Sequence, residues 1–281
     1  MPMPKVSIVL PVWNGAKYLE LAIQSVLDQS ISDLELLIVD DSSTDETPKI
    51  IRFFQAQDSR IIVIRNKTNL KLPGSLNVGF KKARGEWLTW TSDDNIMEKD
   101  CLGLLINAAE RQKIDFIYSD YKVIDENGNF LKMNQTGPAE NLFMENTIGA
   151  CFLYNRRVAD KIGEYDVQKF MFEDYDYWVR IYKAGIQMSH LSDLSPYKYR
   201  LHESQLSVKR QLPREFVYFR YDLIKDLDDN YKKARAYLGL TKLAFRNKAP
   251  KTGISSILHL LSTNPKYTFP AVYSLVMKKL Q

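Results

Sequence analysis

Short apolar runs alternate with segments of helical periodicity through the N-terminal third of the chain. The runs are rich in β-branched and aliphatic residues and end at turn-forming residues, which predicts buried strands. The segments between them repeat apolar side chains every three to four positions, which predicts amphipathic helices. The expected strands are residues 5–12, 34–39 and 61–64 and the apolar run after Glu86, which ends where the acids begin at Asp93; the expected helices are 18–29, 46–57 and 76–83. This alternation predicts an α/β fold with an open, mostly parallel sheet flanked by helices.

The alternation loosens after Asn95. A hairpin is expected over residues 123–131, because the Asn127-Gly128 pair favours a tight turn at its tip. Further strands are expected at 116–120, 148–154, 188–191 and 197–201, and further helices at 102–112, 157–162 and 174–184, the last closed by Gly185. Residues 1–210 are expected to form the α/β domain. Residues 211–281 are expected to form a C-terminal basic helical region, with helices at 214–228, 231–247, 254–261 and 271–280.

Charge is unevenly distributed along the chain. The net charge is +5, but residues 231–281 hold ten Lys/Arg and no Asp/Glu, whereas the first 230 residues hold 29 Lys/Arg and 34 Asp/Glu. An acidic body does not favour nucleic acid as a partner. The basic amphipathic end is predicted to make peripheral contact with an anionic membrane surface. The alternative is a small helical cap on the catalytic body, with a solvated basic face.

Several features indicate the compartment. No apolar run approaches the roughly 20 residues that span a bilayer. The start of the chain runs directly into an expected strand and lacks a signal-peptide pattern. Cys101 and Cys151 stand in apolar surroundings and are interpreted as packed thiols in a reducing compartment. The expected location is cytoplasmic, and contact through the basic end would place the protein at the inner face of the membrane.

Two pairs of adjacent carboxylates follow expected strands. Asp40 and Asp41 follow the second strand, and Asp93 and Asp94 follow the fourth. Ligands bind beyond the carboxyl ends of strands in open α/β sheets, so both pairs are predicted at one edge of the sheet. Asp93 and Asp94 would suit a hard divalent cation that also binds a diphosphate. Asp40 and Asp41 would accept hydrogen bonds from a ribose hydroxyl or a base N–H. The alternative for each pair is a helix cap.

The first strand is not followed by a glycine-rich phosphate loop of either the dinucleotide-binding or the P-loop type. Residues 11–15, Pro-Val-Trp-Asn-Gly, stand there instead. Diphosphate binding is therefore expected to depend on a cation, which supports the metal interpretation of Asp93. Lys71, expected in a loop, is the lysine chosen to meet the diphosphate.

A further pair of acids, Glu173 and Asp174, opens the helix expected at 174–184, beside Phe172 and Tyr175. A carboxylate walled by aromatic rings could have a raised pKa, as a general base requires. The alternative is that these acids cap the helix. Trp178, one turn further on, offers an apolar platform for a sugar ring or packs in the core. Glu173 and Trp178 are expected on the acceptor side of the site.

These motifs together resemble the family 2 inverting glycosyltransferases with the GT-A fold. The segments that carry the resemblance are residues 6–15, 37–45, 85–94, 172–178 and 199–202, in that order, within roughly residues 5–207. One departure from the pattern is Thr91, which stands where the family often has the first Asp of its Asp-x-Asp motif. This departure puts metal affinity in question but leaves Asp93 as a direct ligand.

The resemblance implies roles for individual residues. Pro11, Val12, Trp13 and Asp41 would hold the nucleotide, with Trp13 against the base. Asp93 would be the last position of the Asp-x-Asp motif and, beside Asp94, would bind Mg²⁺ or Mn²⁺ and the diphosphate. Asp174 matches the position of the general base. His202 would approach the diphosphate or serve as a further metal ligand, and Arg200 on the same segment is another candidate for the diphosphate.

The expected function is transfer of a sugar, with inversion, from a nucleotide-diphosphate sugar, a UDP-sugar first, to an acceptor hydroxyl. The acceptor is expected to be a glycan or a lipid-linked molecule in cell-surface polysaccharide or glycolipid synthesis. The first alternative is a non-catalytic protein that binds sugar-nucleotides. The second is a nucleotidyltransferase, which normally has the glycine-rich, basic loop that this chain lacks.

Overall fold

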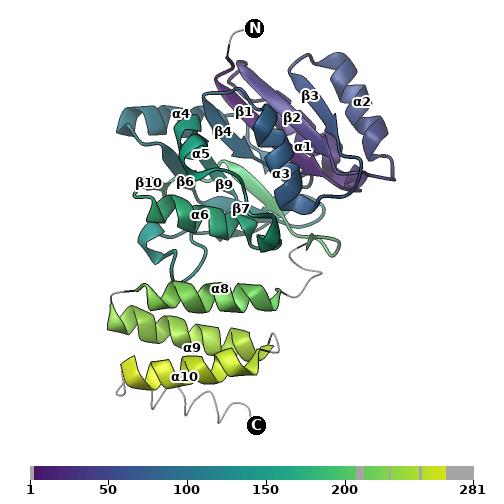
Figure 1. Cartoon of the computed structure of the whole chain (residues 1–281). Helices are drawn as coiled ribbons and strands as arrows, with labels where there is room; N and C mark the ends of the chain where they lie inside the picture. The colour runs from purple at the N-terminus through teal and green to yellow at the C-terminus, as the bar shows by residue number, and fades with distance from the viewer. Residues whose placement is uncertain (1–2, 207–211, 228, 247–248, 264–281) are drawn as a thin grey trace. The chain divides into compact units, whose positions relative to one another are not determined.

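The computed structural model of the protein describes residues 3–206, 212–227, 229–246 and 249–263 (Figure 1). The chain divides into two compact units. The larger unit comprises residues 1–139 and 147–203, and the smaller comprises residues 140–146 and 204–281. All the residues predicted to bind the donor, the cation or the acceptor belong to the larger unit.

A seven-stranded sheet runs through the described part of the larger unit, in the order β10-β6-β9-β4-β1-β2-β3. The strands are β1 (Val6–Val12), β2 (Leu34–Asp40), β3 (Ile61–Arg65), β4 (Trp87–Trp90), β6 (Phe116–Ser119), β9 (Cys151–Asn155) and β10 (Met188–Leu191). Most neighbours pair in parallel, but β9 is antiparallel to both β4 and β6. Every residue of β1 and β2 is buried, as expected for parallel strands covered on both faces. The predicted open, mostly parallel sheet is confirmed.

Helices cover both faces of this sheet because side chains alternate along each strand (Figure 1). Ile8, Leu10, Leu36 and Ile38 point to the face that contacts α1 (Ala16–Leu27), α2 (Thr47–Gln57) and α4 (Cys101–Gln112). On the opposite face Val9 and Val39 approach Gly79 of α3 (Lys71–Lys82). There Phe116 and Phe152 contact Trp178 of α6 (Glu173–Lys183). The short helix α5 (Arg156–Ile162) follows β9, and 3₁₀ turns occupy Ala139–Asn141 and Val167–Lys169.

A second, four-stranded sheet has the order β5-β11-β7-β8. Its strands are β5 (Ile96–Met97), β7 (Tyr121–Ile124), β8 (Phe130–Asn134) and β11 (Tyr197–Arg200). The predicted hairpin is confirmed as β7 and β8, and Gly128 at its tip has a φ of +91°. Strand β5 was not predicted, because two residues carry no periodicity. Helix α3 begins at Lys71 and not at residue 76, and the apolar spacing that predicted it is visible only after Gly74.

The described part of the smaller unit consists of α8 (Arg214–Lys225), α9 (Asn230–Arg246) and α10 (Pro250–Thr263). Val217, Ile224, Tyr237 and Leu240 are among its buried apolar residues, and Phe143 from the 140–146 segment packs against them. The helix predicted at 271–280 lies outside the described residues. Within the described chain, no helix has the length and apolar character that a membrane span needs.

Candidate active site

The first, second and fourth strands end side by side. Val12 is paired with Asp40 across β1 and β2, and Val9 is paired with Trp90 across β1 and β4. Because all three strands run in the same direction, the loops that follow them emerge at one edge of the sheet. These loops carry the residues predicted to bind the nucleotide and the cation.

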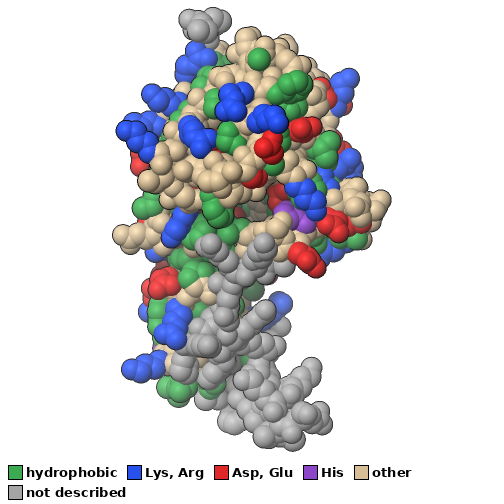
Figure 2. Space-filling model, turned by 90° about the vertical axis from the view of Figure 1, so that its right-hand side faces the viewer, with side chains coloured by type: hydrophobic (Ala, Val, Ile, Leu, Met, Phe, Trp, Pro, Cys, Tyr) green, Lys and Arg blue, Asp and Glu red, His purple; other side chains and the backbone are tan. Residues whose placement is uncertain are grey.

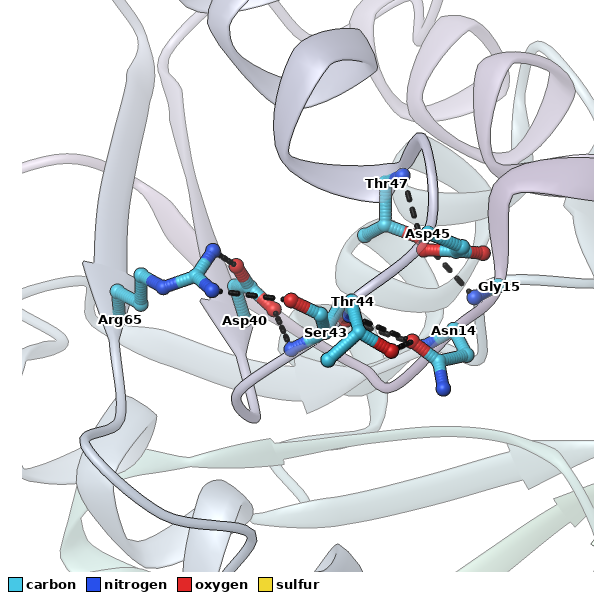
Figure 3. A network of polar contacts seen from close by, with 8 residues as sticks. All are labelled: Asn14, Gly15, Asp40, Ser43, Thr44, Asp45, Thr47 and Arg65. Carbon is cyan, nitrogen blue, oxygen red and sulfur yellow. Dashed lines mark hydrogen bonds and ion pairs between the residues drawn. The ribbon is translucent and has the colours of Figure 1, made fainter.

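The loops after β1 and β2 are joined by hydrogen bonds (Figure 3). The backbone N–H of Asn14 donates to Ser43 Oγ at 3.0 Å, and the N–H of Thr44 donates back to Asn14 Oδ1 at 2.8 Å. The N–H of Gly15 donates to Thr47 Oγ1 at 3.1 Å. Asp45 accepts the N–H of Thr47 at 3.0 Å, so this acid fixes the start of α2. The loops after β1 and β2 therefore hold one another in place through their own hydrogen bonds.

Asp40 and Asp41 have different surroundings, although they are adjacent. Asp40 is buried, pairs with the Arg65 guanidinium and accepts the N–H of Ser43 at 2.8 Å (Figure 3). Its oxygens are thus used within the protein, and the expectation that it binds a ligand is wrong. Asp41 Oδ1 accepts from Asn66 Nδ2 and from the N–H of Leu70, both at 2.8 Å. These bonds orient Asp41 at the strand end, where the resemblance had placed a nucleotide ligand.

Trp13, the first residue after β1, presents its indole to solvent. Its exposed fraction is 54%, whereas Pro11 and Val12 are buried as the last residues of the strand. Pro11 and Val12 therefore have only limited surface to offer a ligand and support the turn that carries Trp13. An exposed indole at the mouth of an α/β sheet is suited to stacking on a planar base.

Asp93 lies directly against the backbone of Gly15. A Cβ added at Gly15 would overlap the Asp93 carboxylate and lie 2.8 Å from Val12 Cγ2, so only glycine leaves room for this approach. Burial, together with the neighbouring charges of Asp94 and Asp45, raises the pKa of Asp93 to about 8. Acidic side chains and a histidine side chain gather beside a hollow in this part of the surface (Figure 2).

Asp94 is held by the segment that follows β11. Its Oδ2 lies 3.0 Å from His202 Nε2, and its backbone carbonyl accepts from Arg200 Nε at 2.9 Å. Burial raises the pKa of the Asp94 carboxyl, and its Oδ1 is buried with no hydrogen-bond partner. A buried carboxylate oxygen without a partner is costly unless a cation or a donor reaches it.

The donor set fits a hard cation only in part. Asp93 and the unpartnered oxygen of Asp94 are suitable ligands for Mg²⁺ or Mn²⁺, which keep several waters and take phosphate oxygens. No group of three or more His, Cys, Asp or Glu side chains in the described chain is arranged to hold a metal ion. The Nε2 of His202 is already bonded to Asp94, so the predicted metal contact of His202 would require that bond to break or the other ring nitrogen to bind.

Arg200 is a structural residue rather than a free cation. It is 2% exposed, and besides Asp94 it donates through Nη1 to the carbonyls of Asp125 and Glu126. Its guanidinium also lies over the ring of Tyr18, 4.6 Å from the centroid. The expectation that Arg200 meets the diphosphate is wrong, because burial and these bonds already use the guanidinium. Sequence reasoning did not find this role, because its partners are backbone atoms that leave no residue pattern.

Helix α6 carries the predicted acceptor-side residues. Asp174 stands in its first turn, where its Oδ1 accepts the N–H of Tyr175 at 2.6 Å. Burial, with smaller contributions that include the charge of Asp174, raises the pKa of the half-buried Tyr121 phenol. Trp178 is fully buried, with its ring 4.5 Å from that of Phe152. The platform interpretation of Trp178 is wrong, because its ring packs against Phe116 and Phe152 of the main sheet and leaves no face for a sugar. Glu173 is 3% exposed, and its Oε2 accepts the N–H of Met171 at 2.7 Å, so its carboxylate faces the preceding turn.

Lys71 is exposed, but it is the first residue of α3 and not a loop residue. Its backbone has a φ of +62°. Its Nζ lies 5.2 Å from the centroid of the Phe170 ring, in the segment that leads to α6. This contact brings the cation at the start of α3 next to the turn that precedes Asp174.

Comparison with known proteins identifies the family. The model of glycosyl transferase family 2 matches residues 7–175. An uncharacterized glycosyltransferase from Haemophilus influenzae is 32% identical over 136 residues, which cover 48% of this chain and 54% of that protein. An uncharacterized glycosyltransferase from Methanocaldococcus jannaschii is 31% identical over 192 residues, which cover 64% of this chain and 65% of that protein. The chain thus spans only part of the length of these relatives.

Solved structures share the fold. Staphylococcus aureus TarS, crystallised with UDP-GlcNAc, has a TM-score of 0.69 at 18% identity, covering 94% of this chain and 82% of that one. The mannosyltransferase PcManGT of Pyrobaculum calidifontis, in complex with GDP-Man and Mn²⁺, has a TM-score of 0.65 at 14% identity, covering 100% and 81%. The α/β fold is thus that of these GT-A-like neighbours. Because the family model covers more than half of its residues, the chain belongs to glycosyl transferase family 2.

Proposed function

We propose that this protein transfers a sugar from a nucleotide-diphosphate sugar to an acceptor hydroxyl, with inversion at the anomeric carbon. The observation that carries the proposal is the position of Asp93 and Asp94. Asp93 lies against Gly15, and Asp94 keeps a buried oxygen without a partner at the edge where β1, β2 and β4 end. Membership of the glycosyltransferase family supports the same activity.

A divalent cation, Mg²⁺ or Mn²⁺, would be held by Asp93 and the free oxygen of Asp94. When bound, it would neutralise charge that develops on the leaving diphosphate. His202 orients Asp94 through the 3.0 Å contact, and Arg200 fixes the backbone carbonyl of the same residue. The protein thus supports its cation site through a second layer of bonds, as metal sites commonly require.

The nucleotide would lie along the joined loops after β1 and β2. Trp13 would stack on the base, with Pro11 and Val12 beneath it, and Asp41 would accept a hydrogen bond from the base or ribose. The Lys71 ammonium would leave the ring of Phe170 and approach the diphosphate. Each of these residues would contact the donor and not the acceptor, so we expect its substitution to change the KM for the donor.

Asp174 would act as the general base that removes the proton from the acceptor hydroxyl as the hydroxyl attacks the anomeric carbon. The bond from the Tyr175 N–H orients the Asp174 carboxylate in the first turn of α6. Burial, and to a smaller extent the charge of Asp174, raises the pKa of the half-buried Tyr121 and the buried Tyr165, so both phenols stay neutral where the Asp174 charge acts on them. A single displacement of this kind requires no covalent intermediate.

The donor class is a nucleotide-diphosphate sugar, with a UDP-sugar as the first candidate. TarS was crystallised with UDP-GlcNAc, and PcManGT with GDP-Man. One relative, 29% identical over 184 residues, is named the PGL/p-HBAD biosynthesis glycosyltransferase of Mycobacterium bovis. A lipid-linked or glycan acceptor is therefore our proposal for this chain. The predicted membrane contact of residues 231–281 remains part of the same proposal.

The test is a panel of UDP-, GDP-, dTDP- and CMP-sugars, scored by thermal shift and by release of free nucleotide, with and without Mn²⁺. We expect one donor to raise the unfolding temperature through mass action and to be slowly hydrolysed only with metal. Asp93→Ala should abolish the metal dependence, and Asp174→Asn should abolish turnover but keep donor binding. Donor binding with no turnover by the wild type toward water or a mixed glycan and lipid-extract acceptor pool would favour the non-catalytic binding protein.

A further inference from the structure

The turn that leads into α6 has an unusual backbone. Met171 has a φ of +84°, in a region that side chains with a Cβ rarely adopt. A residue with a Cβ is unfavourable in this conformation, so the surrounding structure must impose it. Phe172, the next residue, precedes the first turn of the helix and gives it no side-chain cap.

Glu173 supplies the bond that opposes this cost. Its Oε2 accepts the N–H of Met171 at 2.7 Å, reaching back two residues from the first position of α6. The side chain is 3% exposed, so the bond forms away from solvent. Burial, together with the charge of Asp174, raises the pKa of Glu173 to about 8, so near pH 7 the Met171 N–H is accepted by a largely protonated carboxyl group, which keeps a carbonyl oxygen as acceptor. Other bonds continue the turn: Phe172 N–H donates to the carbonyl of Lys169 at 2.9 Å, and Asp176 N–H donates to that of Phe172 at 3.0 Å.

This geometry separates the tasks of the two adjacent acids. Glu173 points toward the backbone of the turn, whereas Asp174, the next residue, is the base of the proposed function. Phe172 gives the helix no side-chain cap, and the Asp174 carboxylate accepts the N–H of Tyr175 at 2.6 Å within the first turn, so the direction of that turn and of its carboxylate follows the conformation of the backbone that leads in from Met171. A change in that conformation would move the Asp174 carboxylate relative to the acceptor, and small displacements of a reacting group reduce rates strongly.

We propose that Glu173 is a positioning residue: it holds Met171 in the left-handed conformation and thereby sets the place of the Asp174 carboxylate. The inference rests on the proposed function, since it assumes that Asp174 is the base. It replaces the expectation that Glu173 itself contacts the acceptor.

The test uses four variants: Glu173→Gln, Glu173→Ala, Met171→Gly and the double variant Glu173→Ala/Met171→Gly. Glutamine keeps an acceptor oxygen for the Met171 N–H, whereas alanine removes it. Glycine adopts a positive φ without the steric cost, so it needs less support from Glu173. The readout is kcat and donor KM for metal-dependent donor hydrolysis, where water takes the place of the acceptor.

We expect Glu173→Gln to stay within about threefold of the wild-type kcat and Glu173→Ala to lose about 10- to 100-fold, each with an unchanged donor KM. The double variant should recover at least a third of the wild-type kcat. Thermal unfolding of each variant identifies loss of kcat that is due to unfolding alone. If Glu173→Ala alone does not fold, the double variant decides the question, because glycine at residue 171 should restore both folding and at least a third of the wild-type kcat.

Two results would overturn the proposal. One is an unchanged hydrolysis rate in a folded Glu173→Ala. The other is a loss in Glu173→Gln as large as in Glu173→Ala, without recovery in the double variant, which would mean that the carboxylate itself contacts the reacting groups. Asp174→Asn separates this inference from the proposed function. If that variant remains active, the base assignment fails, whatever the Glu173 series gives.

Discussion

Thr91 Oγ1 lies 2.8 Å from the hydroxyl of Tyr197, and both side chains are buried. Thr91 occupies the position where related sequences often have the first acid of the Asp-x-Asp motif. In this chain that position faces the contact between β4 and the smaller sheet and not the ligand edge. In place of an acid, this position has a threonine whose hydroxyl is hydrogen-bonded to the Tyr197 hydroxyl.

This pair predicts the effect of changing Thr91. Thr91→Val should lower the free energy of unfolding by about 1 kcal/mol, because the Tyr197 hydroxyl loses its partner. Thr91→Asp should cost more, because it buries a carboxylate beside a phenol. Neither variant should bind Mn²⁺ more tightly than the wild type. Chemical denaturation and Mn²⁺ titration check both effects, and tighter Mn²⁺ binding by Thr91→Asp would show that residue 91 faces the metal.

A second prediction concerns the pH dependence of stability without metal. The pKa of Asp93 is raised to about 8, so the folded state holds the proton more tightly than the unfolded state, where the pKa is about 3.9. The contribution of Asp93 to stability therefore falls as pH rises from about 4 to about 8, and changes little above that. Asp93→Asn should remove this slope and raise the unfolding temperature at pH 9 by about 2–4 °C for each kcal/mol of relieved repulsion.

Mn²⁺ should change the same contribution of Asp93 to stability. The ion should raise the unfolding temperature of the wild type at pH 8, and the shift should be small or absent in Asp93→Asn, which has lost a charged ligand. A metal-free wild type whose stability is as independent of pH as that of the variant would contradict the raised pKa. Differential scanning fluorimetry over a pH series with and without Mn²⁺ measures both effects.

A third prediction follows from the close approach of Gly15 and Asp93. In Gly15→Ala the new methyl group would overlap the Asp93 carboxylate, so that side chain must rotate away. We expect Mn²⁺ affinity to fall at least tenfold while the protein stays folded. Gly239→Ala is the matched control, because a Cβ there meets nothing within 4 Å. Isothermal titration with Mn²⁺ compares the two, and equal affinities would mean that Asp93 does not bind the ion in the place described.

A fourth prediction concerns Trp13 and Trp178, both of which were expected from the sequence to contact a ligand. Trp13→Ala should change the free energy of unfolding by less than about 0.5 kcal/mol, because the indole is 54% exposed. It should weaken donor binding about tenfold through lost stacking. Trp178→Ala should instead destabilise the fold by about 3–5 kcal/mol, because the ring extends from α6 and is fully buried against Phe152 of β9.

The measurements are denaturant unfolding and donor affinity for each tryptophan variant. Trp178→Phe is the control, since it keeps most of the aromatic contact and should recover much of the stability. A Trp13→Ala protein with unchanged affinity for every nucleotide-sugar would remove Trp13 from the donor site. A stable, inactive Trp178→Ala would restore the acceptor-side interpretation of that residue.

The sequence by itself determined the main sheet and its flanking helices, because buried parallel strands are continuous apolar runs and their helices have a strong period. It also placed the acids at the strand ends, since strand direction alone decides which loops share an edge. The strand β5 and the antiparallel place of β9 were decided only by tertiary structure, because pairing partners lie far apart in sequence and leave no local pattern.

Within the site, the sequence named the acids but could not separate them. Asp40 and Asp41 are chemically identical, yet Arg65 occupies the first, while Asn66 and the Leu70 N–H orient the second. Trp178 and Trp13 are likewise the same residue in different surroundings. The identity of a side chain follows from the sequence, but its direction and its partners depend on contacts between distant segments. For that reason only the folded chain showed that Thr91 faces Tyr197, that Arg200 holds Asp94 and that Glu173 holds Met171.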